Sequence, residues 1–230
     1  MKHGFPSIAV MQPYLYPYAG YFRLMAATDL FVILDCVQFN RRGRVHRVEV
    51  PAPSGGTEWL TLPLRRQPRE TSIRDLAFAD GAREALDERL HRHAFLRSGT
   101  GPAAGPVREH LFGPLGTVVD FLERGLRLVA ELLRLTTPVV RSSSLALPPQ
   151  LRGADRIIAI ARTAGASRYL NAPGGRDLYD PAAFQGAGLE LSFLPPYEGR
   201  HPFLLPSLMA GDVEDIRADV FEQIGRRYRP

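Results

Sequence analysis

The chain has 230 residues, of which 45% are hydrophobic and 23% are charged. This composition is typical of a globular protein with a substantial core and argues against extensive disorder. A single cysteine excludes an internal disulfide and fits the reducing cytoplasm. The first residues lack the apolar segment of a signal peptide, and no run approaches the roughly 18 apolar residues of a membrane span. We therefore expect a cytoplasmic protein with no membrane partner.

Basic residues outnumber acidic ones by five, 29 against 24, and most of them are arginines. Such an excess fits nucleic acid, an acidic carrier protein or a phosphate-bearing substrate, and a GC-rich coding sequence produces it equally well. The charge alone identifies no partner. Nucleic acid is disfavoured, because the arginines and aromatic residues are not interleaved as in known binding modules.

The segment 7–50 predicts a strand, a loop, a short helix and a second strand. The runs Ile8–Met11 and Leu30–Leu34 are continuously apolar, as in parallel strands that are covered on both faces. Polar residues follow each run, at the carboxyl end where open parallel sheets bind their ligands. After the first run stands Gln12, and after the second stand Asp35, Cys36 and Gln38.

The loop between these strands is rich in tyrosine and proline and leads into a helix expected from Tyr21 to Ala27. Its two prolines stiffen the path, and Gly20 permits a close backbone approach at the helix entrance. Tyr14, Tyr18 and Tyr21 either pack over the sheet or line a substrate site. The same strand, loop and helix order also begins the nucleotidylyltransferase fold, but adenylyl transfer is disfavoured, because tyrosines stand where that fold places histidines around its glycine.

A basic loop follows the second strand, with four arginines between positions 41 and 47. Its His46 and Arg47 precede a third strand at 48–50, and the planar guanidinium of Arg47 suits a carboxylate or phosphate. Residues 59–64 predict another strand, and residues 73–78 predict a short edge strand. The alternative for the loop is a solvated surface segment.

Helical periodicity dominates a middle section at about 81–135. Helices are expected at 81–95, 107–112 and 116–135, with a mobile Gly/Pro/Ala-rich loop at 98–106. A His-x-His pair at 91–93 has no further cluster of ligands beside it, so we expect no metal site. We expect one α/β domain over 1–230, in which this section is a helical insert.

Strands are expected again at 137–144, 167–171 and 189–194, with helices at 155–165, 182–186 and 213–228. The fold class is thus α/β, with a Rossmann-like, mostly parallel sheet, flanking helices and the helical middle section. The loop after the strand at 167–171 contributes Asn171, Gly174, Gly175 and Tyr179. The two glycines allow backbone N–H groups to approach an oxygen of a ligand, although a plain turn explains them equally well.

The early segment resembles the WbqC-like protein family, which has a Gln-Pro-aromatic-x-Pro-x-x-Gly-Tyr-Phe motif and then an Asp-x-Phe-Val-x-x-Asp-x-Val-Gln-Phe motif. The matching residues are Gln12, Pro13, Tyr14, Pro17, Gly20, Tyr21, Phe22, Asp29, Phe31, Val32, Asp35, Val37, Gln38 and Phe39. The likeness continues through the strand at 59–64, the segment 153–157 and the loop 169–180. Two positions depart from the family: Cys36 stands where an acid is common, and His46 where an asparagine is common.

The resemblance implies a role in O-antigen or natural-product pathways, with transfer of a glycyl or other aminoacyl group. We expect an acyl- or aminoacyltransferase whose donor is an activated amino acid such as a carrier-protein thioester and whose acceptor is an amine or hydroxyl, with no cofactor. The catalytic candidates are Asp35 or His46 as base and Cys36 as nucleophile. The substrate-binding candidates are Gln12, Tyr14, Tyr18, Tyr21, Gln38, Arg47, Asn171, Gly174, Gly175 and Tyr179. The alternatives are a non-catalytic binding or scaffolding module and a nucleotide-using enzyme.

Overall fold

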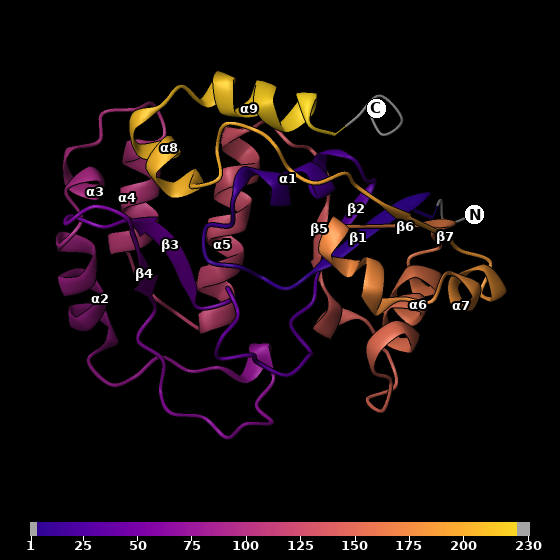
Figure 1. Cartoon of the computed structure of the whole chain (residues 1–230). Helices are drawn as coiled ribbons and strands as arrows, with labels where there is room; N and C mark the ends of the chain where they lie inside the picture. The colour runs from indigo at the N-terminus through magenta and orange to yellow at the C-terminus, as the bar shows by residue number, and fades with distance from the viewer. Residues whose placement is uncertain (1–3, 225–230) are drawn as a thin grey trace.

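A five-stranded parallel sheet forms the centre of the fold (Figure 1). The computed structural model describes residues 4–224. The strand order is β5-β2-β1-β6-β7, and every neighbouring pair runs parallel. The strands are β1 (Ser7–Met11), β2 (Leu30–Ile33), β5 (Val139–Arg141), β6 (Arg168–Asn171) and β7 (Glu190–Phe193). The predicted α/β, Rossmann-like fold is confirmed.

Each face of the sheet packs against its own group of helices, as the continuous apolar strands require. On one face, Ile8 and Val10 of β1 contact a cluster that includes α6 (Gly153–Thr163) and α7 (Pro181–Gly186). On the other face, Ala9, Phe31 and Ile33 belong to a larger core that includes α1 (Ala19–Ala26) and α9 (Val213–Glu222). Successive side chains along β1 and β2 therefore pack alternately into two separate apolar layers.

The middle section forms four helices, and the larger core is continuous with them. These helices are α2 (Ala82–His91), α3 (Ala94–Ser98), α4 (Ala104–Phe112) and α5 (Val118–Leu132). Helix α5 begins at the N-cap Thr117, whose Oγ1 accepts a hydrogen bond from the Asp120 N–H at 3.2 Å. A further helix, α8 (Leu204–Ala210), packs against α3 and α4 and was not predicted.

Two short strands, β3 (Arg47–Pro51) and β4 (Thr57–Thr61), form a separate antiparallel hairpin beside these helices. The predicted edge strand at 73–78 is wrong. Its first residues form the 3-10 helix η1 (Ile73–Asp75), and only Phe78 pairs, in a single bridge with Leu64. Ile73 is completely buried, so the apolar residues that suggest a strand instead fix a turn against the core.

The segment 98–106, predicted as a mobile loop, is held against the C-terminal region. The Gly101 N–H donates to the Met209 carbonyl at 2.9 Å, and Ala103 and Ala104 are buried. A Cβ at Gly99 would lie 2.5 Å from the Met209 oxygen. Its glycines therefore permit close backbone packing against α8 rather than motion. The predicted helix at 213–228 ends at Glu222, and its last residues lie outside the described range.

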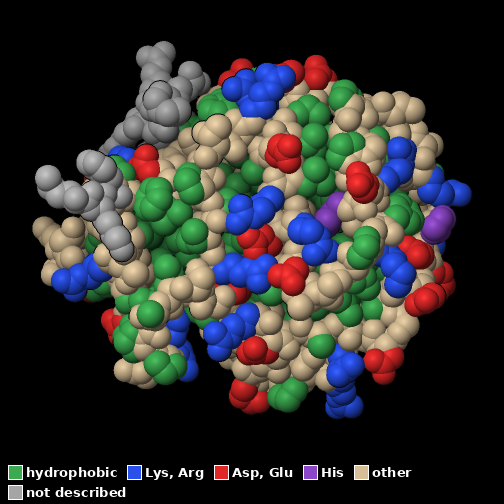
Figure 2. All heavy atoms as spheres, turned by 180° about the vertical axis from the view of Figure 1, so that it is seen from behind, with side chains coloured by type: hydrophobic (Ala, Val, Ile, Leu, Met, Phe, Trp, Pro, Cys, Tyr) green, Lys and Arg blue, Asp and Glu red, His purple; other side chains and the backbone are tan. Residues whose placement is uncertain are grey.

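Positive and negative side chains are interspersed on the face seen from behind Figure 1 (Figure 2). Arg141 forms ion pairs with both Asp120 and Glu123. The net positive charge is therefore not gathered on that face. Within residues 4–224, the helices are all too short or too polar to cross a membrane.

Candidate functional site

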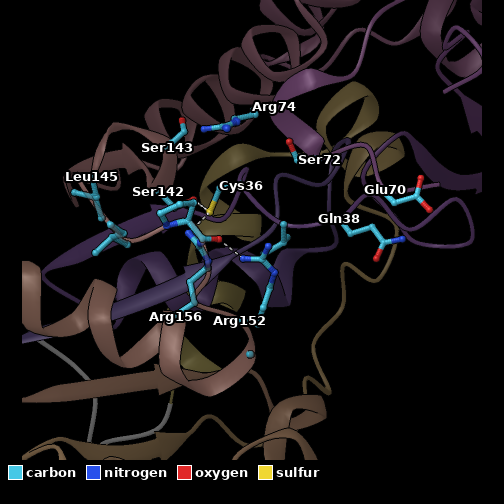
Figure 3. A pocket seen from close by; sticks show the side chains of 14 residues that line it. Cys36, Gln38, Glu70, Ser72, Arg74, Ser142, Ser143, Leu145, Arg152 and Arg156 are labelled. Carbon is cyan, nitrogen blue, oxygen red and sulfur yellow. Dashed lines mark hydrogen bonds between the residues drawn. The ribbon is translucent and has the colours of Figure 1, made fainter. Parts of the chain in front are cut away.

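A cavity of about 530 Å3 opens at the carboxyl edge of the sheet, where β2 and β5 end (Figure 3). Cys36 follows β2, and the 3-10 helix η2 (Ser142–Ser144) follows β5. The remaining walls come from the loop at 70–74, from the segment 145–149 and from the start of α6. The lining residues are Cys36, Val37, Gln38, Glu70, Ser72, Arg74, Ser142, Ser143, Leu145, Leu147, Pro149, Arg152, Gly153 and Arg156.

Cys36 lies between a hydroxyl and a guanidinium in this cavity. Its Sγ is 3.0 Å from Ser142 Oγ and accepts a hydrogen bond from Arg156 Nη1 at 3.1 Å. Ser142 Oγ donates its one hydrogen to Asp35 Oδ1 at 2.8 Å, so the thiol is the donor left for the sulfur–hydroxyl contact. Both partners are buried. The sulfur is therefore held in a fixed place at the cavity wall.

Asp35 lies beneath the cavity wall and is completely buried. Its Oδ1 accepts hydrogen bonds from Ser142 Oγ at 2.8 Å and from the Ser143 N–H at 2.9 Å, and its Oδ2 accepts one from Ser143 Oγ at 2.5 Å. A buried carboxylate needs such donors. Asp35 thereby fixes the η2 turn at the end of β5, and it is not among the lining residues. Its role as a general base stays a prediction.

Arginine side chains surround the opening of this cavity. Arg74 approaches from the loop side, while Arg152 and Arg156 approach from the start of α6 (Figure 3). Arg156 is 7% exposed, and its guanidinium donates to the carbonyls of Leu151 at 2.9 Å and of Pro148 and Pro149 at 3.3 Å. Glu70 is the one carboxylate among the lining residues. The cavity therefore favours an anionic ligand.

His46, the other predicted base, lies in a different place. It lines a second cavity together with Phe39, whose ring centroid is 5.0 Å away, and Cys36 is absent from that lining. Burial, and then the charge of Arg47, lowers the pKa of His46 to about 4. The structure thus brings Cys36 together with Arg156 and Ser142, and it does not bring Cys36 together with His46.

Tyr18 and Arg47 share a third cleft, of about 370 Å3, with Arg44, Tyr197 and Phe203. The Tyr18 and Tyr197 rings are 5.5 Å apart. The Arg47 guanidinium lies 4.2 Å from the centre of the Trp59 ring and donates to the Gly43 carbonyl at 3.1 Å and the Arg42 carbonyl at 2.5 Å. These contacts hold Arg47 to the hairpin and to its own loop.

Gln12, Tyr14 and Tyr21 form a group of their own next to β1. The Tyr21 hydroxyl donates to the Gln12 carbonyl at 2.8 Å, and the Tyr14 ring is 5.7 Å from the Tyr21 ring. Burial raises the pKa of Tyr21 well above its usual value and also raises that of Tyr14. Neutral phenols that pack against the core serve the shape of the loop.

The remaining predicted residues divide between two places. Gln38 lines the Cys36 cavity, and its Nε2 donates to the Arg69 carbonyl at 2.7 Å. Asn171 ends β6, and its Oδ1 accepts a hydrogen bond from the Ala172 N–H at 2.8 Å. Gly174 and Gly175 belong to the 3-10 helix η3 (Pro173–Leu178), and the Tyr179 ring packs edge-on against Phe184 and Tyr169. Unlike Gln38, the four residues from this later loop do not line the Cys36 cavity; they are Asn171, Gly174, Gly175 and Tyr179.

Sequence reasoning missed the arginines of this cavity. Arg74, Arg152 and Arg156 come from two segments about 80 positions apart in the sequence, and no spacing rule joins them. A usable signal was the pair of arginines that flanks a predicted helix start, because an uncapped helix N-terminus also attracts anions. Among residues 4–224, no group of three or more His, Cys, Asp or Glu side chains is arranged to hold a metal ion.

Comparison with known proteins identifies the family of this chain. An uncharacterised protein of Mycobacterium tuberculosis, Rv1507c, is 24% identical over 199 residues, which cover 84% of this chain and 83% of the relative. No solved structure matches the chain. The sequence profile of the WbqC-like protein family matches residues 12–202, which include both the first strand's loop and the Cys36 cavity. The chain therefore belongs to the WbqC-like protein family.

Proposed function

We propose that this protein is a cytoplasmic acyl- or aminoacyltransferase that forms a thioester on Cys36. The observation that carries the proposal is the sulfur itself, held by Arg156 and Ser142 in an arginine-rich cavity at the carboxyl edge of a parallel sheet. Ligands of such sheets bind at this edge. A cysteine beside a cation is a common arrangement for a nucleophile.

The proposed reaction has two steps, each balanced in atoms. The Cys36 sulfur attacks the carbonyl carbon of an activated donor such as a carrier-protein thioester, a new carbon–sulfur bond forms, and the donor leaves as a free thiol that takes the Cys36 proton. The amine or hydroxyl of the acceptor then attacks the Cys36 thioester. The acyl group moves to the acceptor, and the acceptor's proton returns to Cys36.

Residues around Cys36 supply what these steps need. The tetrahedral intermediates carry a negative oxygen, which N–H donors stabilise. The guanidinium groups of Arg152 and Arg156 line the same cavity. Asp35 acts through the η2 turn, because its carboxylate holds the Ser142 and Ser143 side chains in position. We propose that the acceptor is a sugar or natural-product intermediate.

Intact-mass spectrometry tests this proposal. The wild-type protein is mixed with an aminoacyl-loaded carrier protein and a panel of amine and hydroxyl acceptors, and we expect an acyl adduct on the protein, unloading of the carrier and an acylated product. Cys36→Ala is expected to lose the adduct and to slow transfer at least about a thousandfold, as loss of a nucleophile does. Cys36→Ser is expected to trap the adduct as a slowly hydrolysed ester. Arg162→Ala, on the exposed side of α6, is the control.

Other outcomes point to other functions. Transfer that survives Cys36→Ala and is lost in Asp35→Asn would replace the covalent route with direct transfer that uses Asp35 as base. Ligand binding without any carrier unloading would make the protein a binding module of such a pathway.

A further inference from the structure

The charges that line the Cys36 cavity do not balance. Arg74, Arg152 and Arg156 face one lining carboxylate, Glu70. Among residues 4–224, no carboxylate lies within 4.0 Å of a guanidinium nitrogen of Arg152 or Arg156. Within the same described residues, the one carboxylate near the Arg74 guanidinium is Asp75, 3.7 Å from its Nε, and both side chains are more than half exposed to solvent. Among the lining residues, guanidinium groups therefore outnumber carboxylates three to one around a space large enough for a small ligand, while the buried carboxylate of Asp35 lies beneath the wall.

Arg156 is fixed before any ligand arrives. Its hydrogen bonds to three backbone carbonyls and to the Cys36 sulfur leave its guanidinium little freedom. Arg152 is held at the same opening by its own bonds to the carbonyls of Pro149 and Leu151. Charged donors that are already ordered lose little conformational entropy when they bind an anion.

The start of helix α6 adds backbone donors to the same wall. Its N-cap residue, Arg152, makes no side-chain cap, so the first N–H groups lack the usual side-chain acceptor. Gly153 lines the cavity at a φ of +47°, and no atom lies within 4 Å of the place where a Cβ would be. A ligand can therefore approach the backbone directly, at the positive end of the helix dipole.

We propose that this wall is a subsite for a phosphate group on the substrate of the Cys36 reaction. Arg74 and Arg152 hold the phosphate from opposite sides of the opening, and Arg156 and the start of α6 lie behind it (Figure 3). A phosphate group suits a wall on which guanidinium groups outnumber carboxylates, and its oxygens accept more hydrogen bonds than a carboxylate does. The reaction of the bound substrate at Cys36 rests on the proposed function, whereas the phosphate subsite itself does not.

Protection of Cys36 from alkylation tests the subsite without any turnover. Cys36 is the only cysteine of the chain, so intact mass reports its reaction with iodoacetamide directly. We expect inorganic phosphate to slow this alkylation at a concentration where chloride of equal ionic strength does not. Arg74→Ala and Arg152→Ala are each expected to raise the protecting concentration of phosphate at least about tenfold, the loss of one charge-assisted contact. Arg156→Lys keeps a cation at the buried position and is expected to weaken protection less than either alanine.

The control and the alternative ligands decide the outcome. Arg162→Ala removes an exposed arginine from the same helix and is expected to leave protection unchanged. Acetate that protects as well as phosphate, or protection that is insensitive to both alanine substitutions, would overturn the proposal. Phosphopantetheine and AMP, compared at equal concentration, distinguish a carrier-type arm from a nucleotide as the source of the phosphate. Phosphate protection without any acyl transfer would keep the subsite and reject the transferase.

Discussion

Gly174 and Gly175 are adjacent in the chain and lie in opposite environments. A Cβ on Gly175 would lie 2.2 Å from Asn171 Nδ2 and 3.0 Å from Asn171 Cγ, whereas no atom lies within 4 Å of a Cβ on Gly174. Asn171 is buried and its Oδ1 is bonded to the Ala172 N–H. The glycine pair, read from the sequence as a backbone approach to a ligand, thus includes one residue that makes room for a neighbouring amide.

This difference predicts unequal effects of the same substitution. Gly175→Ala is expected to lower the free energy of unfolding by about 1–3 kcal/mol, the usual cost of forcing a side chain into a packed site. Gly174→Ala, its matched control, is expected to be neutral or to stabilise by up to about 1 kcal/mol through the unfolded chain. Urea unfolding of both variants measures the difference. Equal effects would show that the amide of Asn171 moves aside at no cost.

At the scale of elements, one hydrogen-bonded chain joins the tyrosine-rich loop to helices α4 and α5. Tyr16 has a φ of +41°, which L-residues rarely adopt, and its hydroxyl lies 2.8 Å from His110 Nδ1. His110 Nε2 lies 2.9 Å from the Phe121 carbonyl. Because a carbonyl only accepts, Nε2 carries the hydrogen, and Nδ1 accepts from Tyr16. The unusual backbone of Tyr16 is therefore held by a neutral imidazole from α4.

This contact predicts a loss of stability in acid. Burial lowers the pKa of His110 to about 4, below the usual value of about 6.5 that the unfolded chain retains. As the pH falls from about 6.5 to about 4, the unfolded state takes up this proton first, so the free energy of unfolding decreases. His110→Phe is expected to reduce that slope by up to about 1.4 kcal/mol per pH unit. Tyr16→Phe keeps the imidazole, so it is expected to lower stability by about 1–3 kcal/mol and to retain a slope. Urea unfolding at several pH values checks both, and an unchanged slope in His110→Phe would contradict the assignment.

The strands of the sheet can be predicted from local sequence, whereas the residues of the candidate site can be predicted only in part. Continuous apolar runs such as Ile8–Met11 predict buried parallel strands, and the polar residues after them predict the edge on which Cys36 lies. Ile73 illustrates the limit, because a buried residue in a short apolar run fits a strand and a 3-10 turn equally. The arginines at the start of α6 could have been noticed from the sequence, but their place beside Cys36 could not, since only tertiary packing brings Arg156 to Cys36.

At the scale of the whole molecule, a buried arginine joins α1 to segments near the end of the described range. Arg23 on α1 is 1% exposed, and its guanidinium donates to the Gln223 carbonyl at 2.8 Å and the Pro195 carbonyl at 3.0 Å. It also lies 5.3 Å from the centre of the Tyr197 ring. Helices α1 and α9 thereby pack as one layer over the sheet (Figure 1). The same apolar core continues from this layer to the hairpin that carries Trp59.

Arg23→Ala is therefore expected to destabilise the whole fold rather than release α9 alone. The substitution removes two partly buried hydrogen bonds, to the Gln223 and Pro195 carbonyls, each worth about 0.5–1.5 kcal/mol, and it opens a cavity under α9. Trp59 is the only tryptophan and lies on β4, far along the chain from this contact. We expect its fluorescence and the far-UV circular dichroism to report one shared urea transition, shifted to lower denaturant by the same amount. Arg162→Ala, on the exposed side of α6, controls for the loss of an arginine. One shared transition is expected because a continuous core transmits the loss to every element that shares it. A Trp59 transition that kept its wild-type midpoint while the helical signal fell early would instead show that α1 and α9 unfold separately from the hairpin.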